Sequence, residues 1–482
     1  MKRISLNVTK IIYMLFCILI YLIYIYVCSN FNNLSLLKSS EGIVIISWIG
    51  IIMYIISVFT WYKLTGHLFD LYTIFLTFAY IFNYGHCFLW AFNIHAQGEI
   101  GSGLLYNSIV PSNLDITKTQ IITLLSLALL HFGVLFFHKK NDESKINIKK
   151  ILFDNSILYK ASIIIFIISF PFKLYQLINY IIIRLNYGYG AIYYGAHIFN
   201  NPLVNFVSRF FIPSLFGILI CSNFSKKGKT IFYFSFGIFV LLSLIIGDRG
   251  EWLYPLFIYV YLHHTYIKKI NIRSFFLIVI LGYLFLKIVM AFTFIRNVDI
   301  SMNSIQKSLE FENDPAITSI IHMGSSMGIQ LVVIKNNYPK YPNGNSYLYG
   351  IASIIGENNL KMINQDYEYI TDWFSQQYLG LKNTGAGLSI VGESLMNYGQ
   401  YFGPVFLILI GAVISKILNY INIKKNSKNM FYCVIVFLYL IEMSRGAFGG
   451  NFKIIIQTFI LFYFVSFIIV QRSKKGMMNY EK

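Results

Sequence analysis

The chain has 482 residues, of which 56% are hydrophobic and 12% are charged, and its formal net charge is +19 at pH 7. This hydrophobic excess excludes an ordinary soluble domain, and continuous apolar runs of about 17–22 residues exclude a β-barrel with its alternating strands. The sequence therefore predicts an all-α polytopic membrane protein. In chain order, the about twelve predicted transmembrane spans are 11–28, 43–62, 68–90, 119–138, 161–182, 203–221, 230–246, 252–267, 274–295, 402–420, 430–443 and 453–471.

The lysines between the spans predict the orientation of the chain. With the N-terminus in the cytoplasm, lysine-rich segments such as 139–150, 226–229, 268–273 and 424–428 all fall on the inner side, which is the usual bias of membrane proteins. The C-terminus then also lies inside. Basic inner segments facing anionic lipid headgroups account for the positive net charge without a nucleic-acid partner.

The same orientation divides the chain into three parts. Residues 1–295 hold the first nine predicted spans, and residues 402–482 hold the last three with the cytoplasmic C-terminus. Between them, 296–401 is too long to be a plain connector, so we expect a large, partly helical extracytoplasmic loop. Asp314 before Pro315 predicts a helix start in this loop, and "YPNGN" at 341–345 predicts a turn.

Arginines are distributed differently from lysines. Four of the eight arginines lie at outer ends of predicted spans, and a fifth, Arg209, lies within the sixth span. The four are Arg184, Arg249, Arg296 and Arg445. Arginine suits bidentate recognition of phosphate and stays charged when it is partly desolvated. Lys173 and Lys287 also fall in outer halves of predicted spans and are weaker candidates.

Two of these arginines stand just before predicted helices that run inward from the outer face. Arg249 lies in the turn "GDRGE" at 247–251 with Asp248 and Glu251, and Arg445 lies in "SRGAFGG" at 444–450. Helix N-termini attract anions, and neighbouring glycines let a ligand approach the backbone. The pattern predicts an anion site at the outer leaflet. The alternative is that these arginines only contact lipid headgroups.

Other polar residues outside the predicted spans are further candidates. Glu393 is the only charge in the glycine-rich stretch 385–404 and would need a partner, most simply an outer arginine. Glu357 lies among loop carboxylates, and His322 lies on an apolar helix face, where histidine is more often structural. The tyrosine-rich stretch 185–199 fits an interfacial aromatic belt as well as sugar stacking.

Motifs for nucleotide hydrolysis, zinc chemistry and serine hydrolysis are absent from the sequence, so we expect neither a metal nor another cofactor. Two stretches, "GDRGEWLYP" at 247–255 and "GAGLSIVGESLMNYGQYFGP" at 385–404, instead resemble Wzy-type O-antigen and oligosaccharide repeat-unit polymerases. The long outer segment before the last spans and the composition rich in Ile, Asn, Lys and Tyr are also similar to that family. In architecture, the resemblance covers essentially the whole chain.

The resemblance implies a GT-C-like membrane glycosyltransferase of the bacterial inner membrane. Its substrates would be oligosaccharide repeats on undecaprenyl pyrophosphate, joined at the periplasmic face. In that reading Arg249 would bind the pyrophosphate leaving group, with Asp248 or Glu251 holding its guanidinium in place. Glu393, Glu357, Asp248 and His322 are open candidates for the base that takes the acceptor proton. The remaining substrate-binding candidates are Arg184, Arg209, Arg296, Arg445, Glu251 and Glu357.

Several alternatives stay open at the level of sequence. A lipid-linked oligosaccharide flippase would have a similar number of spans but short loops, and an O-antigen ligase would share the fold and the membrane face. Whether the product is O-antigen, capsule or exopolysaccharide, and whether a polysaccharide chain-length regulator binds, is also open.

Overall fold

The computed structural model describes residues 8–31, 33–106, 109–139, 156–194, 201–248, 250–294, 314–355, 360–362, 368–381, 385–423 and 426–480. Regular structure in these ranges is helical, apart from one isolated bridge between Leu105 and Ile109. Nine of the described helical stretches are long and apolar enough to cross a membrane. The protein is therefore an all-α polytopic membrane protein, as the sequence predicts.

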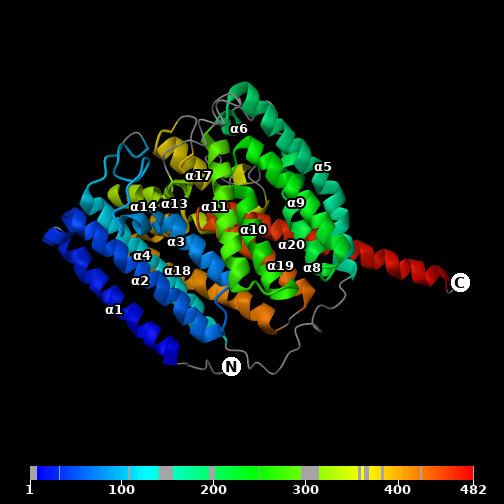
Figure 1. Cartoon of the computed structure of the whole chain (residues 1–482), viewed down its shortest axis with the longest axis horizontal. Coiled ribbons are helices and arrows are strands. Elements are labelled where there is room, and N and C mark those ends of the chain that lie inside the picture. Colours follow the sequence, from blue (N-terminus) through cyan, green and yellow to red (C-terminus); the bar gives the residue numbers. More distant parts are fainter. Residues whose placement is uncertain are drawn as a thin grey trace. The chain divides into compact units, whose positions relative to one another are not determined.

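The chain forms two compact units, whose helices are labelled in Figure 1. Unit 1 comprises 1–142, 316–423 and 440–452, and unit 2 comprises 143–315, 424–439 and 453–482. The helices of unit 1 are α1 (Val8–Asn30), η1 (Ser35–Lys38), α2 (Ser40–Thr65), α3 (Leu71–Trp90), α4 (Asn113–Phe137), α13 (Pro315–Gly324), α14 (Ser326–Lys335), α15 (Ser346–Ala352), η6 (Ser353–Ile355), α17 (Ile370–Asp372), η7 (Trp373–Tyr378) and α18 (Ile390–Ile423). Those of unit 2 are α5 (Ser156–Tyr187), α6 (Ala191–Tyr194), α7 (Pro202–Ser208), α8 (Phe211–Cys221), α9 (Lys226–Ile246), α10 (Gly250–Leu262), η4 (His263–Ile267) and α11 (Ile272–Phe294). α19 (Ser427–Met443) and α20 (Phe448–Tyr480) contribute residues to both units.

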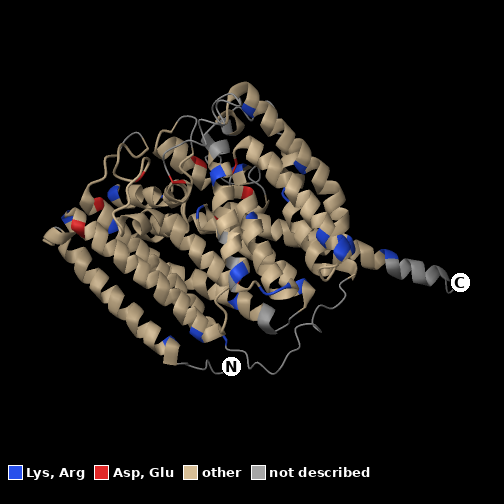
Figure 2. Cartoon of the chain, viewed as in Figure 1, with Lys and Arg blue, Asp and Glu red and all other residues tan. Residues whose placement is uncertain are grey.

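Most of the predicted spans correspond to helices. Eight of the nine membrane-crossing candidates overlap predicted spans, and the ninth, Pro315–Lys335, lies in the segment expected to be a loop. The predicted spans at 68–90, 252–267, 274–295 and 430–443 are the helices α3, α10, α11 and α19. Helices α10 and α19 are shorter than the nine, α3 is less apolar, and α11 contains the apolar stretch Phe276–Met290. Figure 2 shows that long parts of the ribbon carry no charged residue, as a bilayer requires.

In unit 1, α4 is the central helix, and it contacts α1, α2, α3, α14 and α18. Ser112 begins it with a capping box, in which the Ser112 side chain accepts from the Asp115 N–H and Asp115 accepts in return. The most extensive contact among the described helices is between α4 and α18. It depends on Gly133 and Gly411, because a Cβ atom on either would overlap backbone atoms of the other helix.

The α18 helix changes direction at one glycine. Gly399 has φ 71° and ψ −172°, which is a non-helical conformation that favours glycine. The break separates a short buried part, with Glu393, from a longer part that carries Gly411. The two parts can therefore pack against different neighbours.

Two local predictions within 296–401 are confirmed. Helix α13 begins at Pro315, directly after Asp314, and the stretch 341–345 is a turn in which Gly344 has φ 93°. The helices α13 and α14 are not isolated from the rest of unit 1. Gly85 of α3 lies against Gly324 at the end of α13, and α14 contacts α3, α4 and α18.

In unit 2, the long helix α5 packs against α7, α8 and α9. Helix α9 carries its lysines at one end only. It begins with Lys226, Lys227 and Lys229 and ends at Gly247, which takes the left-handed conformation with φ 86° and so terminates the helix. The turn "GDRGE" therefore lies at the end of α9 opposite its lysines.

Candidate functional site

One face of α5 carries a polar stripe along a mostly apolar helix. Lys173, Gln176, Tyr180 and Arg184 are spaced by three, four and four residues, so their side chains project from one side of the helix. The opposite side is exposed and apolar, with Tyr175, Ile178, Ile182 and Leu185. Polar residues within a bilayer are expensive and need partners, and the stripe finds them on α7 and at the turn between α9 and α10.

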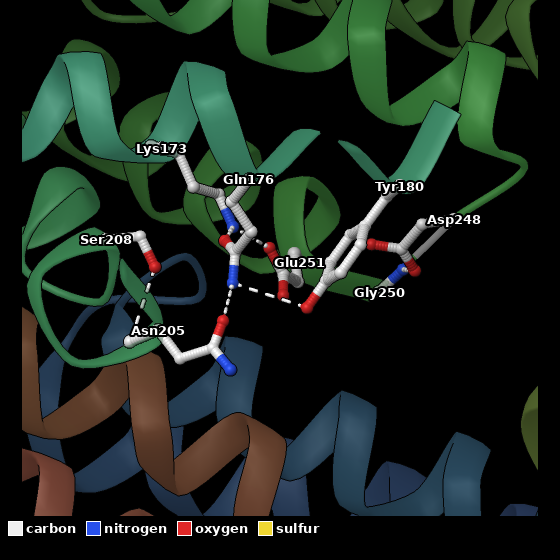
Figure 3. A network of polar contacts seen from close by, with 8 residues as sticks. All are labelled: Lys173, Gln176, Tyr180, Asn205, Ser208, Asp248, Gly250 and Glu251. Atoms are coloured by element: carbon white, nitrogen blue, oxygen red, sulfur yellow. Dashed lines mark hydrogen bonds and ion pairs between the residues drawn. The ribbon is translucent and has the colours of Figure 1, made fainter. Parts of the chain in front are cut away.

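The first part of the stripe forms the network drawn in Figure 3. Lys173 Nζ lies 2.6 Å from Glu251 Oε2 and 3.1 Å from Gln176 Oε1. The Gln176 amide donates to Asn205 Oδ1 of α7 at 2.9 Å and to the Tyr180 hydroxyl at 3.3 Å. These bonds join three segments that are far apart in the sequence.

Burial of the central ion pair is uneven. The Lys173 side chain is 9% exposed, and its ammonium also lies 5.3 Å from the centre of the Phe239 ring, whereas the Glu251 side chain is 58% exposed. The carboxylate thus reaches solvent from the turn, while the cation stays among the helices. This arrangement brings a positive charge into an apolar environment with one acidic partner at its outer edge.

The turn itself is held by backbone contacts. The N–H of Asp248 donates to the Ser243 carbonyl at 3.0 Å, and Asp248 Oδ1 accepts from the N–H of Gly250 at 3.1 Å. The indole of Trp252 donates to the Asp248 carbonyl at 3.0 Å. Arg184, buried at the far end of the stripe, donates to the carbonyl of Ile245 in the last turn of α9. Helix α5 therefore holds the turn from both sides.

The turn concentrates charge in a confined space. Asp248 is half-buried, and its pKa is raised above the ordinary value by burial and, to a smaller extent, by the charge of Glu251. Tyr180 has Glu251, Arg209 and Asp248 as electrostatic neighbours, and Figure 3 draws the two carboxylates on either side of it. Among the predicted site residues, the structure therefore brings together Asp248, Glu251, Arg184 and Arg209.

Glu393 lies in unit 1 with different partners from the predicted arginine. Its buried carboxylate accepts from the Ser346 hydroxyl at 2.6 Å and from the N–H of Phe448, the first residue of α20, at 2.7 Å. Two residues further on, the N–H of Gly450 donates to the Tyr369 hydroxyl. These donors at the start of α20 are therefore bonded within the protein, and Glu393 serves as an acceptor for one of them.

The remaining predicted residues fall into two groups. Arg445 and His322 are exposed in unit 1. The Arg445 backbone lies next to Gly387 of the glycine-rich stretch 385–404, and His322 lies in the last turn of α13. Arg249, Arg296 and Glu357 lie outside the described residues. Groups of three His, Cys, Asp or Glu side chains that could hold a metal ion are not found in the described part of the chain.

Sequence reasoning missed Gln176, Tyr180 and Asn205 and gave Lys173 little weight. The signal was available for α5, because polar residues at 173, 176, 180 and 184 repeat with the period of a helix. The sequence carried no such signal for Asn205, because an asparagine near a helix start is ordinarily a cap.

In the described part of unit 2, Lys173 forms an ion pair with Glu251 and is an electrostatic neighbour of Asp248. Arg184 bonds the last turn of α9, and Arg209 is an electrostatic neighbour of Tyr180.

Comparison with known families gives one match, the family described as O-antigen polysaccharide polymerase Wzy, over residues 9–476. Neither curated proteins nor solved structures give a match. The family match covers the helices of both units, the stripe of α5, the turn 247–251 and the Glu393 region. The chain therefore belongs to the O-antigen polysaccharide polymerase Wzy family.

Proposed function

We propose that the protein polymerises oligosaccharide repeat units carried on undecaprenyl pyrophosphate into O-antigen or a related surface polysaccharide. The observation that carries this proposal is the match to the Wzy family over nearly the whole chain. The charged turn of unit 2 supports it, because the substrate would be an anion with a lipid tail. No metal or other cofactor is part of the proposal.

The proposed reaction breaks one bond and forms one. The anomeric carbon of the growing glycan leaves its lipid pyrophosphate and bonds to a sugar hydroxyl of a second lipid-linked unit, whose proton passes to a base. Negative charge develops on the leaving pyrophosphate, and nearby arginines would stabilise it. We assign this role to Arg249 and Arg209, because both belong to or adjoin the turn 247–251.

We assign the role of base to Asp248. A half-buried carboxylate with a raised pKa accepts a proton more readily at neutral pH than an ordinary aspartate. Glu393 is a weaker candidate, because its side chain is fully buried, whereas that of Asp248 is half-buried. Arg184 would act indirectly, by fixing the end of α9 through Ile245. His322 remains a proposal for the base, and Glu251, Arg296 and Glu357 remain proposals for contacts with substrate.

The proposal places the reaction at the periplasmic face of the inner membrane. Helix α9 has three lysines in its first four residues and the charged turn at its other end. The positive-inside bias would put the lysines in the cytoplasm and the turn outside, with both chain termini cytoplasmic.

Deletion of the gene tests the function. Lipopolysaccharide from the deletion strain should run on a gel as lipid A core with a single repeat unit, and a plasmid copy should restore the ladder of long chains. Loss of even the single repeat would instead indicate a flippase or a ligase, because repeats would then never reach the core. An unchanged ladder in the deletion strain would overturn the proposal.

Labelling of single cysteines tests the orientation. In a background without the five native cysteines, Tyr187→Cys at the exposed end of α5 should react with a membrane-impermeant maleimide in intact spheroplasts. Lys226→Cys, at the opposite end of α9, is the matched control and should react only after lysis. The reverse pattern would contradict a periplasmic site.

A further inference from the structure

The loop 444–447, between α19 and α20, is fixed on both sides by buried side chains of unit 1. On one side, the carbonyl of Ser444 accepts from Asn83 Nδ2 at 3.0 Å. On the other, the N–H of Phe448 donates to Glu393 at 2.7 Å, and the carbonyl of Ala447 accepts from Asn451 at 3.2 Å. A short loop with this many bonds has little freedom to rearrange.

Asn83 belongs to a chain of polar groups that runs through the interior of unit 1. Asn83 Oδ1 accepts from the Gln330 amide at 2.6 Å, and that amide also lies 3.3 Å from Ser389 Oγ. The carbonyl oxygen of Gln330 accepts from the Thr123 hydroxyl. All four side chains are fully buried. The chain of polar groups thus extends from α4 through α14 and α3 to the loop.

Arg445 is the side chain that this fixed loop presents outward. It is exposed, and its guanidinium lies 5.8 Å from the centre of the ring of Phe82, which precedes Asn83 in α3. The same turn of α3 therefore supplies the ring beside the guanidinium and the amide that holds the backbone. Within the described part of the chain, no carboxylate forms an ion pair with Arg445.

Buried amides are costly unless they are hydrogen-bonded, and Asn83 and Gln330 are bonded to each other, with Asn83 also bonded to the loop backbone. A rigid loop with an exposed arginine over an aromatic ring, and no ion-paired carboxylate among the described residues, is suited to binding an external anion. Rigidity matters because a fixed guanidinium loses less entropy when it forms two parallel bonds to phosphate.

We propose that Arg445 binds the pyrophosphate of a lipid-linked substrate, and that Asn83 and Gln330 are positioning residues that hold Arg445 in place. This inference rests on the proposed function and names a second anion subsite, in unit 1, separate from the turn 247–251.

Binding of undecaprenyl pyrophosphate to the full-length protein in phosphatidylcholine nanodiscs tests the proposal. The variants are compared in an Arg249→Ala background, so that the turn 247–251 does not supply the pyrophosphate contact. Arg445→Ala should weaken binding about 10- to 100-fold, because a charge-assisted bidentate contact is lost. Arg445→Lys should recover only part of the affinity, since lysine keeps the charge but lacks the planar guanidinium that forms two parallel hydrogen bonds. Undecaprenol, which lacks phosphate, should bind wild type and both variants equally.

The positioning role has its own test. Asn83→Ala should weaken binding in the same direction, and the double variant Asn83→Ala with Arg445→Ala should be no weaker than Arg445→Ala alone. Gln120→Ala is the matched control: it removes an equally buried amide of unit 1 that bonds Ser47, and it should leave affinity unchanged. If Asn83→Ala does not fold, Gln330→Met gives the same comparison.

The outcomes separate the two proposals. Wild-type binding that Arg445→Ala leaves intact would overturn the subsite. An equal loss of undecaprenol binding would also overturn it, because the effect of Arg445→Ala would then not depend on phosphate. Additive effects of Asn83→Ala and Arg445→Ala would overturn the positioning role. Failure of the wild type to bind undecaprenyl pyrophosphate would instead count against the proposed carrier.

Discussion

Replacement of Gly133 or Gly411 by leucine should leave little folded protein in the membrane. A Cβ at Gly133 would overlap the carbonyl oxygen of Ile408, and a Cβ at Gly411 would overlap that of Leu130. Overlap with backbone cannot be relieved by a side-chain rotation, so α4 and α18 would have to separate. We expect a loss of at least about 3 kcal/mol, the upper end for overpacked cores, or roughly 100-fold in the ratio of folded to unfolded protein.

The measurement is the amount and the thermal midpoint of a fluorescent fusion on size-exclusion chromatography in detergent. Gly237→Leu in α9 is the matched control, because a Cβ on that helical glycine would meet no other atom within 4 Å. It introduces the same side chain into open space and should be tolerated. If Gly133→Leu and Gly411→Leu behave like this control, the close crossing of α4 and α18 is not required for folding.

Removal of Glu251 should destabilise the protein more than removal of its partner Lys173. Glu251→Gln removes the ion pair of the Lys173 ammonium, which among the described residues keeps Gln176, the Phe239 ring and the more distant charge of Asp248 as neighbours. We expect a loss of about 1–3 kcal/mol, as for other buried groups left without a partner. Lys173→Met keeps the apolar stem and leaves Glu251, 58% exposed, free to be hydrated, so its effect should stay below about 1.5 kcal/mol.

Thermal unfolding of both variants and of the double variant in the same detergent measures the difference. The stability of the double variant should be close to that of Lys173→Met, since neither protein has a buried ammonium at position 173. Glu41→Gln is the control for Glu251→Gln, because both glutamates lie in the first turn of a helix and Glu41 is exposed. Equal losses for Glu251→Gln and Lys173→Met would contradict the uneven burial on which this prediction depends.

Hydropathy predicted most of the long helices but not how their polar side chains are paired. Helix α3 was predicted from its apolar residues, although it contains Asn83 and His86, both fully buried. The stretch Pro315–Lys335 was expected to be part of the outer loop 296–401, although its mean hydropathy is 1.5. In the structure Gln330 is satisfied by Asn83 and Thr123. These partners come from other helices, so the hydropathy of one segment cannot reveal them.

The candidate site shows a similar limit. The unusual charge of the turn 247–251 is visible in the sequence, and so is its relation to a helix start. Its partner Lys173 comes from another helix, 78 residues before Glu251, and meets the turn only through packing. Glu393 was expected to pair with an arginine, but it bonds a serine and a backbone N–H. Backbone donors are present at nearly every residue, so sequence composition cannot single them out.

The polar stripe of α5 has a consequence for how chains of this kind can diverge. One inserted residue between Lys173 and Arg184 would rotate everything after it by about 100° around the helix axis. Arg184 would then leave the carbonyl of Ile245, although the hydropathy of the segment would hardly change. Substitutions on the apolar side of α5 would have no such effect. The candidate site thus depends on the spacing of these four residues along α5. Chains of very different sequence can preserve it as long as they keep that spacing.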